Sequence, residues 1–358
     1  MRATKTKILK KLVEPKKILG FFFSFTVFLL SFQISAARIV VIDTPLLGER
    51  AALLAIGEEL SEHEVTVSPL NQYTPQEGDV VLHTLSKAEE INRLIELKTA
   101  SNNAIKLVNL YDPLVKRSQF DLILLPRHLA PPPEMNLNYA FLSAIPSRIN
   151  LQKLKEVRSS SIWKALPHPN DSLKIAVLVG GPTKHKAMTS QQAELLGKIL
   201  NEIQLKKPKT VLAISSSRRS DPKVFDSLIK AGPTANFVFQ WKENTRDHEN
   251  PYIELLSWAD IIVVTGDSMS MVSDAILSEK TTFVYAPQGS LEQRHQDFIL
   301  SLKDWLNPLT TDLKFKSRPN QPTPNAAKEA ANQIRKLINA NKDSTECSEP
   351  LLGNARIS

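Results

Sequence analysis

From Arg38 onward, short runs rich in valine and isoleucine alternate with longer stretches of helical periodicity, and this alternation constrains the fold more than any other feature. Such a rhythm predicts parallel sheets joined by crossover helices. We expect strands at Arg38–Asp43, Glu64–Pro69, Asp79–Thr84, Ala104–Asn109, Asp121–Pro126, Leu173–Val179, Thr210–Ser215, Asn236–Gln240, Asp260–Thr265 and Thr281–Ala286. We expect helices at Glu49–Leu60, Lys87–Thr99, Ser190–Leu205, Pro222–Ala231, Pro251–Trp258, Ser270–Leu277 and Ala326–Asn339.

The alternation stops after a proline-rich stretch, Pro131–Pro133, and a break from Ser159 to Pro169, and it then starts again. We therefore predict two Rossmann-like, doubly wound α/β domains that face each other across a cleft. The expected N-terminal domain covers residues 38–160, the linker 161–172, the C-terminal domain 173–340 and a disordered tail 341–358. Ligands of such sheets bind beyond the carboxyl ends of the strands, so the turns that follow the strands are the candidate site.

An apolar segment precedes the first strand. Residues 18–37 contain few polar side chains and follow a basic stretch, which predicts a hydrophobic helix that contacts a membrane. Two interpretations of residues 1–37 stay open: a signal peptide of an exported protein, cleaved after Ser35-Ala36-Ala37, or a retained single-pass anchor with a cytoplasmic N-terminus. The first strand begins directly at the potential cut, which leaves no spacer for a protease and favours the anchor.

Charge and cysteine content exclude several classes of protein. The formal net charge is +8, but residues 1–37 hold seven basic residues against one acidic residue, so the rest of the chain is nearly neutral. We therefore predict no nucleic-acid partner, because a phosphate-tracking surface is strongly basic. Cys347 is the single cysteine, which excludes intramolecular disulfides and a cysteine-rich zinc site. The seven histidines are scattered, and no metal-binding motif is present, so we predict neither a metal nor a resident cofactor.

Two turns of the second half carry groups that bind anions. The first places Gly180, Gly181, Thr183 and Lys184 after a strand, where a ligand could approach the backbone and Lys184 could hold its charge. A plain tight turn is the alternative. The second turn contains the candidate residues Ser215, Ser217, Arg218 and Arg219. Hydroxyl and guanidinium groups of this kind suit a phosphate or a carboxylate, and a solvated basic turn is the alternative.

A third turn, Thr265-Gly266-Asp267-Ser268, looks most like a binding site. Ser268 or Ser270 is expected to cap the next helix, whose free amides would point into the proposed cleft. The candidate residues of this turn are Thr265, Asp267, Ser268 and Ser270.

Taken together, these turns resemble a known family. The segments that carry the resemblance are Val179–His185, Ser215–Arg219, Asn250–Tyr252 and Ala259–Ala275, with looser agreement at Asp112-Pro113 and Phe120–His128. They resemble the elongated-mitochondria fission-factor family, whose bacterial members are assigned as glycosyltransferases. The resemblance implies a GT-B-like architecture, in which the second domain holds a nucleotide-sugar donor and the first domain holds the acceptor.

The resemblance leads to two hypotheses of function. The first is a metal-independent GT-B-type glycosyltransferase that uses a nucleotide-sugar or a related phosphorylated donor. Arg218, Arg219 and Lys184 would hold the diphosphate, and Glu49 or Asp112 would act as the general base. The second is a membrane-tethered, non-catalytic scaffold or binding protein on a decayed transferase fold. Two turns of the first half, Thr44–Arg50 and His83–Ser86, depart from the family pattern where the acceptor or base is expected.

Overall fold

The computed structural model describes residues 36–129 and 138–346. The apolar segment predicted at residues 18–37 falls almost wholly outside these ranges, and so does Cys347. Among the helices within the described ranges, none has both the length and the apolar character needed to cross a bilayer.

Six parallel strands form the first sheet, in the order β2-β1-β3-β4-β5-β6. They are β1 (Arg38–Ile42), β2 (Glu64–Ser68), β3 (Val80–His83), β4 (Lys106–Leu110), β5 (Leu122–Pro126) and β6 (Tyr139–Leu142). Helices α1 (Leu47–Glu58) and α2 (Ala88–Ala100) and the short turns η1 (Leu70–Gln72), η2 (Arg117–Gln119) and η3 (Arg127–Leu129) connect them. Because β1 lies between β2 and β3, the order of the strands reverses there, which creates a topological switch point.

The second sheet also has six parallel strands, in the order β12-β11-β10-β7-β8-β9, so that three strands lie on each side of its switch point. They are β7 (Leu173–Val179), β8 (Thr210–Ser216), β9 (Phe237–Phe239), β10 (Ile261–Thr265), β11 (Thr281–Tyr285) and β12 (Leu306–Pro308). The helices that accompany them are α5 (Ser190–Lys206), α6 (Pro222–Ala231), η5 (Asp247–Glu249), α7 (Tyr252–Trp258), α8 (Met269–Leu277) and α9 (Gln293–Ser301). The switch point of this sheet lies between β7 and β10.

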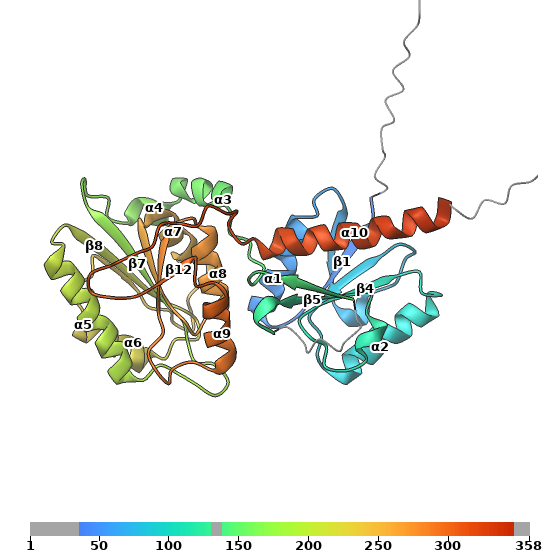
Figure 1. Cartoon of the computed structure of the whole chain (residues 1–358), viewed down its shortest axis with the longest axis horizontal. Coiled ribbons are helices and arrows are strands. Elements are labelled where there is room, and N and C mark those ends of the chain that lie inside the picture. The colour runs from blue at the N-terminus through green and yellow to red at the C-terminus, as the bar shows by residue number, and fades with distance from the viewer. Residues whose placement is uncertain (1–35, 130–137, 347–358) are drawn as a thin grey trace, which may run out of the picture. The chain divides into compact units, whose positions relative to one another are not determined.

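Each sheet is buried on both faces, which explains the continuous apolar runs of its strands. In β1, Ile39 and Val41 belong to a buried cluster with residues of α1, whereas Val40 and Ile42 belong to a cluster with Ile91 of α2. This alternation follows from the period of two along a strand. The prediction of two α/β domains built from parallel sheets is thus confirmed (Figure 1).

The chain passes from the first sheet to the second earlier than the expected linker at residues 161–172. The segment comprising α3 (Leu151–Glu156), η4 (Val157–Ser159) and α4 (Ser161–Ala165) contacts α7 of the second domain. Ser257 of α7 donates a hydrogen bond to the Leu154 carbonyl at 2.6 Å, and Trp258 donates to the Pro167 carbonyl at 2.8 Å. Residues 154–167 are therefore bound to α7 of the second domain.

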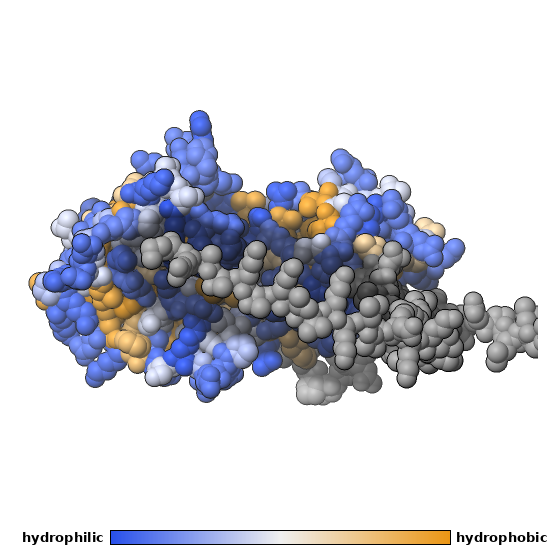
Figure 2. Space-filling model, turned by 90° about the horizontal axis from the view of Figure 1, so that it is seen from above, coloured by the Kyte–Doolittle hydropathy of each residue, from blue (hydrophilic) through white to orange (hydrophobic). Residues whose placement is uncertain are grey.

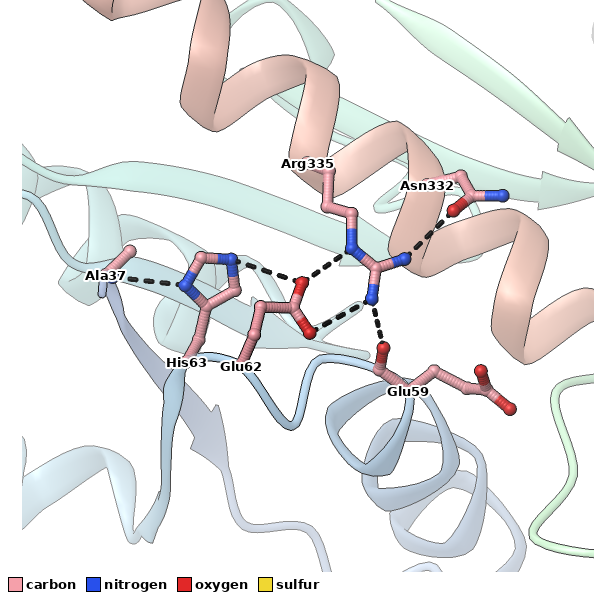
Figure 3. A network of polar contacts seen from close by, with 6 residues as sticks. All are labelled: Ala37, Glu59, Glu62, His63, Asn332 and Arg335. Atoms are coloured by element: carbon pink, nitrogen blue, oxygen red, sulfur yellow. Dashed lines mark hydrogen bonds and ion pairs between the residues drawn. The ribbon is translucent and has the colours of Figure 1, made fainter. Parts of the chain in front are cut away.

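The last helix, α10 (Ala326–Glu346), contacts α1, β5 and β6 of the first domain, although the sequence grouped it with the second (Figure 1). It runs to Glu346, so the first six residues of the predicted disordered tail are helical. Arg335 of α10 binds both carboxylate oxygens of Glu62, at 2.6 and 3.1 Å, and also the Glu59 carbonyl (Figure 3). His63 accepts a hydrogen bond from the Ala37 amide at 3.2 Å in the same network.

Helices α3, α4 and α9 and strands β6 and β12 were not predicted from the sequence. The two strands are short and lie at the edges of their sheets. Pro308 ends β12, and a proline is tolerated at an edge because no neighbouring strand needs its missing N–H group. On the face seen in Figure 2, hydrophilic residues dominate and apolar residues form separate patches.

Candidate functional site

The turns that follow β7 and β10 meet at the switch point of the second sheet. The Thr265 hydroxyl joins them, since it accepts a hydrogen bond from the Gly180 amide at 2.7 Å and donates one to Asp267 Oδ1 at 2.7 Å. Thr265 and Asp267 are both buried. A rigid polar junction therefore lies where doubly wound sheets bind their ligands.

Gly180 and Gly181 are required by packing between these turns. A β-carbon on Gly180 would lie 2.0 Å from Asp267 Oδ1, and one on Gly181 would lie 2.3 Å from the Arg219 carbonyl oxygen. Neither distance is compatible with a side chain. The absence of side chains at the two glycines thus allows the turns after β7, β8 and β10 to pack closely against one another. The sequence-based prediction was that these glycines let a ligand approach the backbone.

The hydroxyls of the turn after β8 bind within the turn itself. Ser215 is buried and donates to the Ser216 carbonyl at 3.2 Å. Ser217 accepts from the Arg219 amide at 3.3 Å. Ser220, which the sequence analysis did not select, donates to the Val179 carbonyl at 3.0 Å and so ties this turn to β7. The side chains of Arg218 and Arg219 remain exposed.

Helix α8 begins at the same junction. Ser268 is its N-cap residue and accepts a hydrogen bond from the Met271 amide at 3.4 Å. Ser270 lies in the first turn and is exposed. The free amides at the start of a helix carry a partial positive charge, which attracts anions.

A pocket of about 240 Å³ opens at this helix start, and we call it the inner pocket. Three cationic side chains line it, namely Lys184, Arg219 and Arg294. Its other lining residues are Tyr111, Ile145, Pro182, Thr183, Asp267, Ser268, Met269, Ser270 and His295. Six of the predicted site residues therefore surround one space: Thr183, Lys184, Arg219, Asp267, Ser268 and Ser270.

Two buried titratable groups of the inner pocket have shifted pKa values. Burial raises the pKa of Asp267 to about 6, opposed by the hydrogen bond from Thr265 and the charge of Arg219. Burial and, secondarily, the charge of Arg294 lower the pKa of His295. The His295 side chain is 4% exposed, and its Nδ1 atom has no hydrogen-bond partner. Arg294 and His295 were missed because their helix, α9, was not predicted.

A larger space of about 760 Å³, the wide pocket, shares six lining residues with the inner pocket: Tyr111, Ile145, Arg219, Met269, Ser270 and Arg294. Glu49 lines it from the first turn of α1 and accepts a hydrogen bond from the Thr84 hydroxyl at 2.7 Å. The other candidate base, Asp112, also lines it.

Asp112 is engaged by a neighbouring cation. Arg117 donates to both of its carboxylate oxygens, at 2.7 and 2.8 Å, and this hydrogen bonding holds the pKa of Asp112 below its usual value. A carboxylate paired in this way is a weak base, so Glu49 is the better placed of the two candidates.

The remaining predicted residues lie beside the inner pocket. Ser217 and Arg218 line a space of about 380 Å³, the side pocket, together with Trp241 and Asn250. The Trp241 amide donates to the Ser216 hydroxyl at 2.8 Å. Ser215, Thr265 and the two glycines line none of the three pockets.

Comparison with known proteins identifies the family. The sequence profile of the family described as Mitochondrial fission ELM1 matches residues 53–338, which is most of the chain. The chain belongs to this family. The resemblance drawn from the turns of the second domain is thereby confirmed.

One relative and two solved structures illustrate the similarity. Uncharacterized protein RP120 of Rickettsia prowazekii (strain Madrid E) is 28% identical over 223 residues, which span 55% of this chain and 62% of that protein. A Listeria monocytogenes protein assigned as a UDP-N-acetylglucosamine 2-epimerase aligns with a TM-score of 0.53 at 12% identity, over 89% of this chain and all of that one. UDP-GlcNAc 2-epimerase of Neisseria meningitidis, solved with UDP-GlcNAc, aligns with a TM-score of 0.48 at 11% identity, over 85% of this chain and all of that one. The Listeria likeness shows the fold, which is GT-B-like.

Proposed function

We propose that the protein is a metal-independent GT-B-type glycosyltransferase and that the diphosphate of a nucleotide-sugar donor binds in the inner pocket. One observation carries the proposal: Lys184, Arg219 and Arg294 line the same pocket as the N-terminus of α8. Charged donors and a helix N-terminus together favour a group with two or more negative charges.

The chemistry of glycosyl transfer needs such a site. When the bond between the sugar and the diphosphate breaks, the leaving group takes the electron pair and its negative charge increases. Preorganised cations and helix amides stabilise this charge without a metal ion. Arg219 and Arg294 supply the cations from different elements, the turn after β8 and helix α9.

The acceptor side of the proposal rests on Glu49. An acceptor hydroxyl in the wide pocket would give its proton to Glu49 as its oxygen attacks the anomeric carbon of the donor. The wide pocket and the inner pocket share six lining residues, so an acceptor and a donor could lie next to each other. The hydrogen bond from Thr84 would keep the Glu49 carboxylate oriented.

A non-catalytic scaffold is the second candidate, and a specific observation favours it. The hydroxyls of Ser215 and Ser217 and the space above Gly180 and Gly181 are used within the turns themselves. A junction built in this way would hold the fold even if the protein had lost catalysis. In both candidates, residues 18–37 attach the protein to a membrane.

Turnover by the purified full chain separates the two. We would incubate it with UDP-, GDP- and CDP-sugars in the presence of EDTA and measure the release of nucleoside diphosphate. A transferase should hydrolyse one donor slowly, and Glu49→Gln should reduce the rate at least about tenfold. Asp112→Asn is the matched control and should reduce it less. If wild type releases no diphosphate from any donor, the scaffold hypothesis replaces the transferase.

A further inference from the structure

The wide pocket has an apolar wall formed by leucines. Leu46 lines it from the turn before α1, Leu47 from the first position of α1, and Leu114 from the loop after β4. Leu125 and Leu129 complete this wall. Leu46, Leu47 and Leu114 are 57%, 45% and 62% exposed, and all three line the same pocket. Exposed apolar residues that gather at one cavity mark a binding surface more often than scattered ones do.

The loop that carries Leu114 is held in a costly conformation. Leu114 has a φ angle of +65° and Tyr111 one of +76°, in the left-handed region that disfavours residues other than glycine. Asp112 stabilises the loop, since it accepts a hydrogen bond from the Leu114 amide at 2.9 Å and binds Arg117. This conformation leaves Leu114 exposed on the wall of the pocket. Its side chain therefore contributes little to the stability of the free protein.

Cationic side chains also line the wide pocket. They are Arg218, Arg219 and Arg294 of the second domain. The two carboxylates of the pocket are Glu49, bound by Thr84, and Asp112, paired with Arg117. Arg294 pairs with Glu292 at 2.9 Å and Arg219 donates to the Pro182 carbonyl at 3.5 Å, so Arg218 is the lining guanidinium group that is left to bind a head group, in the same pocket as the leucine wall.

We infer that the wide pocket binds an amphiphile, with its alkyl or prenyl chain along the leucine wall and a phosphate head group at Arg218. This names the acceptor class of the transferase, a lipid phosphate whose head group also carries the hydroxyl that would give its proton to Glu49, and it therefore rests on the proposed function. A sugar or a peptide would find few hydrogen-bond partners on the leucine wall. A single-chain lipid phosphate matches the leucine wall by polarity and Arg218 by charge.

A homologous series of ligands tests the inference. The full chain in nanodiscs would be titrated calorimetrically with ethyl, butyl, hexyl and octyl phosphate below their micellar concentrations, with empty nanodiscs as the blank. Each methylene that enters an apolar site strengthens binding about fourfold. We expect this slope in wild type and a slope below about twofold in the double variant Leu46→Ser and Leu114→Ser. Leu205→Ser is the control, because Leu205 is 72% exposed on α5 and lines none of the pockets described above.

The head group is tested in the same way. Hexanol should bind at least about tenfold more weakly than hexyl phosphate, and Arg218→Ala should remove most of that difference. If the affinity for the alkyl phosphates does not depend on chain length, the inference is overturned. It is also overturned if the leucine double variant keeps the wild-type gain in affinity per methylene and only co-sediments less with lipid vesicles. UDP is titrated in parallel. If UDP binds and the alkyl phosphates do not, the amphiphile is rejected and the donor site stands; if neither binds, both are rejected.

Discussion

Asp267 shows how one buried side chain couples the inner pocket to pH. It is 5% exposed, and burial raises its pKa from 3.8 to about 6. The folded protein therefore holds a proton that the unfolded chain releases at lower pH. This contribution to stability is fully present below about pH 4 and is lost as the pH rises through about 6.

The substitution Asp267→Asn should remove that pH dependence. Its amide oxygen can still accept the hydrogen bond from Thr265, so the junction is kept. Wild type should lose about 2–3 kcal/mol of unfolding free energy relative to the variant between pH 4 and pH 7. Denaturant titrations at pH 4, 5, 6 and 7 would measure the difference. Asp226→Asn, at an exposed carboxylate of the same domain, is the control. Equal pH slopes for wild type and Asp267→Asn would contradict the burial argument.

Residues that line the candidate site could be selected from the sequence where they directly follow a strand. Those that come from other elements could not. The turns after β7, β8 and β10 could be found because strand ends in doubly wound sheets carry the ligand site. Arg294 and His295 reach the inner pocket from α9, and nothing in their local sequence distinguishes them from surface residues. The pairing of Asp112 with Arg117 depends on the loop conformation, which no periodicity encodes.

At the scale of elements, Gly181 fixes the distance between two turns. Its substitution by alanine would place a β-carbon against the backbone of Arg219, which cannot rotate away as a flexible side chain can. We expect Gly181→Ala to lower the free energy of unfolding by about 1–3 kcal/mol, a typical cost of overpacking. Gly48→Ala in α1 is the matched control, since no atom lies within 4 Å of the position that its β-carbon would take, and it should gain about 0.5–1 kcal/mol. Chemical denaturation of both variants would test the pair, and equal effects would refute the packing role.

Helix α10 is fastened to the first domain by Arg335 (Figure 3). The hydrogen bond from Arg335 lowers the pKa of Glu62 to about 2, so the pair stabilises the fold above about pH 4.5 and its contribution is lost as the pH falls toward 2. Because both side chains are about one third exposed, solvent screening should limit the effect of Arg335→Ala to less than about 1 kcal/mol.

Local opening is the more sensitive readout for this helix. Hydrogen exchange at neutral pH should become faster in α10 for Arg335→Ala and stay unchanged for Lys336→Ala, which removes an exposed cation from the next position. Unchanged exchange in α10 for both variants would show that its apolar contacts alone hold it.

Most elements were predicted from the sequence, but the nine-residue α9 was missed although the three-residue β9 was predicted. Each predicted strand was found, including the partly exposed β2 and β9. The other predicted strands are mostly continuous apolar runs, which are typical of parallel strands buried on both faces. The docking of α10 on the first domain could not be predicted. Its apolar face identifies a helix, but which domain buries that face is a tertiary property.

At the scale of the whole molecule, the hydrogen bonds of Ala37, just before β1, determine how many N-terminal residues can be removed without loss of stability. The Ala37 amide donates to His63 Nδ1 at 3.2 Å, and the Ala37 carbonyl accepts from the Glu64 amide at 3.2 Å. A chain that begins at Ala36 keeps both bonds, and one that begins at Arg38 loses both. We expect the shorter chain to be less stable by about 1–3 kcal/mol. Thermal unfolding would compare them.

The same truncation tests membrane attachment. The full chain should fractionate with membranes, whereas the chain from Ala36 should stay in the supernatant. Aggregation of the chain from Ala36 would indicate that residues 1–35 belong to its core.

The donor site is the central claim, and binding of nucleoside diphosphates tests it most directly. Wild type and Arg219→Ala would be titrated calorimetrically with UDP, GDP and CDP in EDTA, with Lys198→Ala on the exposed face of α5 as the control. A charge-assisted hydrogen bond contributes roughly 1.5–3 kcal/mol, so wild type should bind one nucleotide and Arg219→Ala should bind it about tenfold to a hundredfold more weakly. Absence of binding to wild type at millimolar concentration would contradict the account.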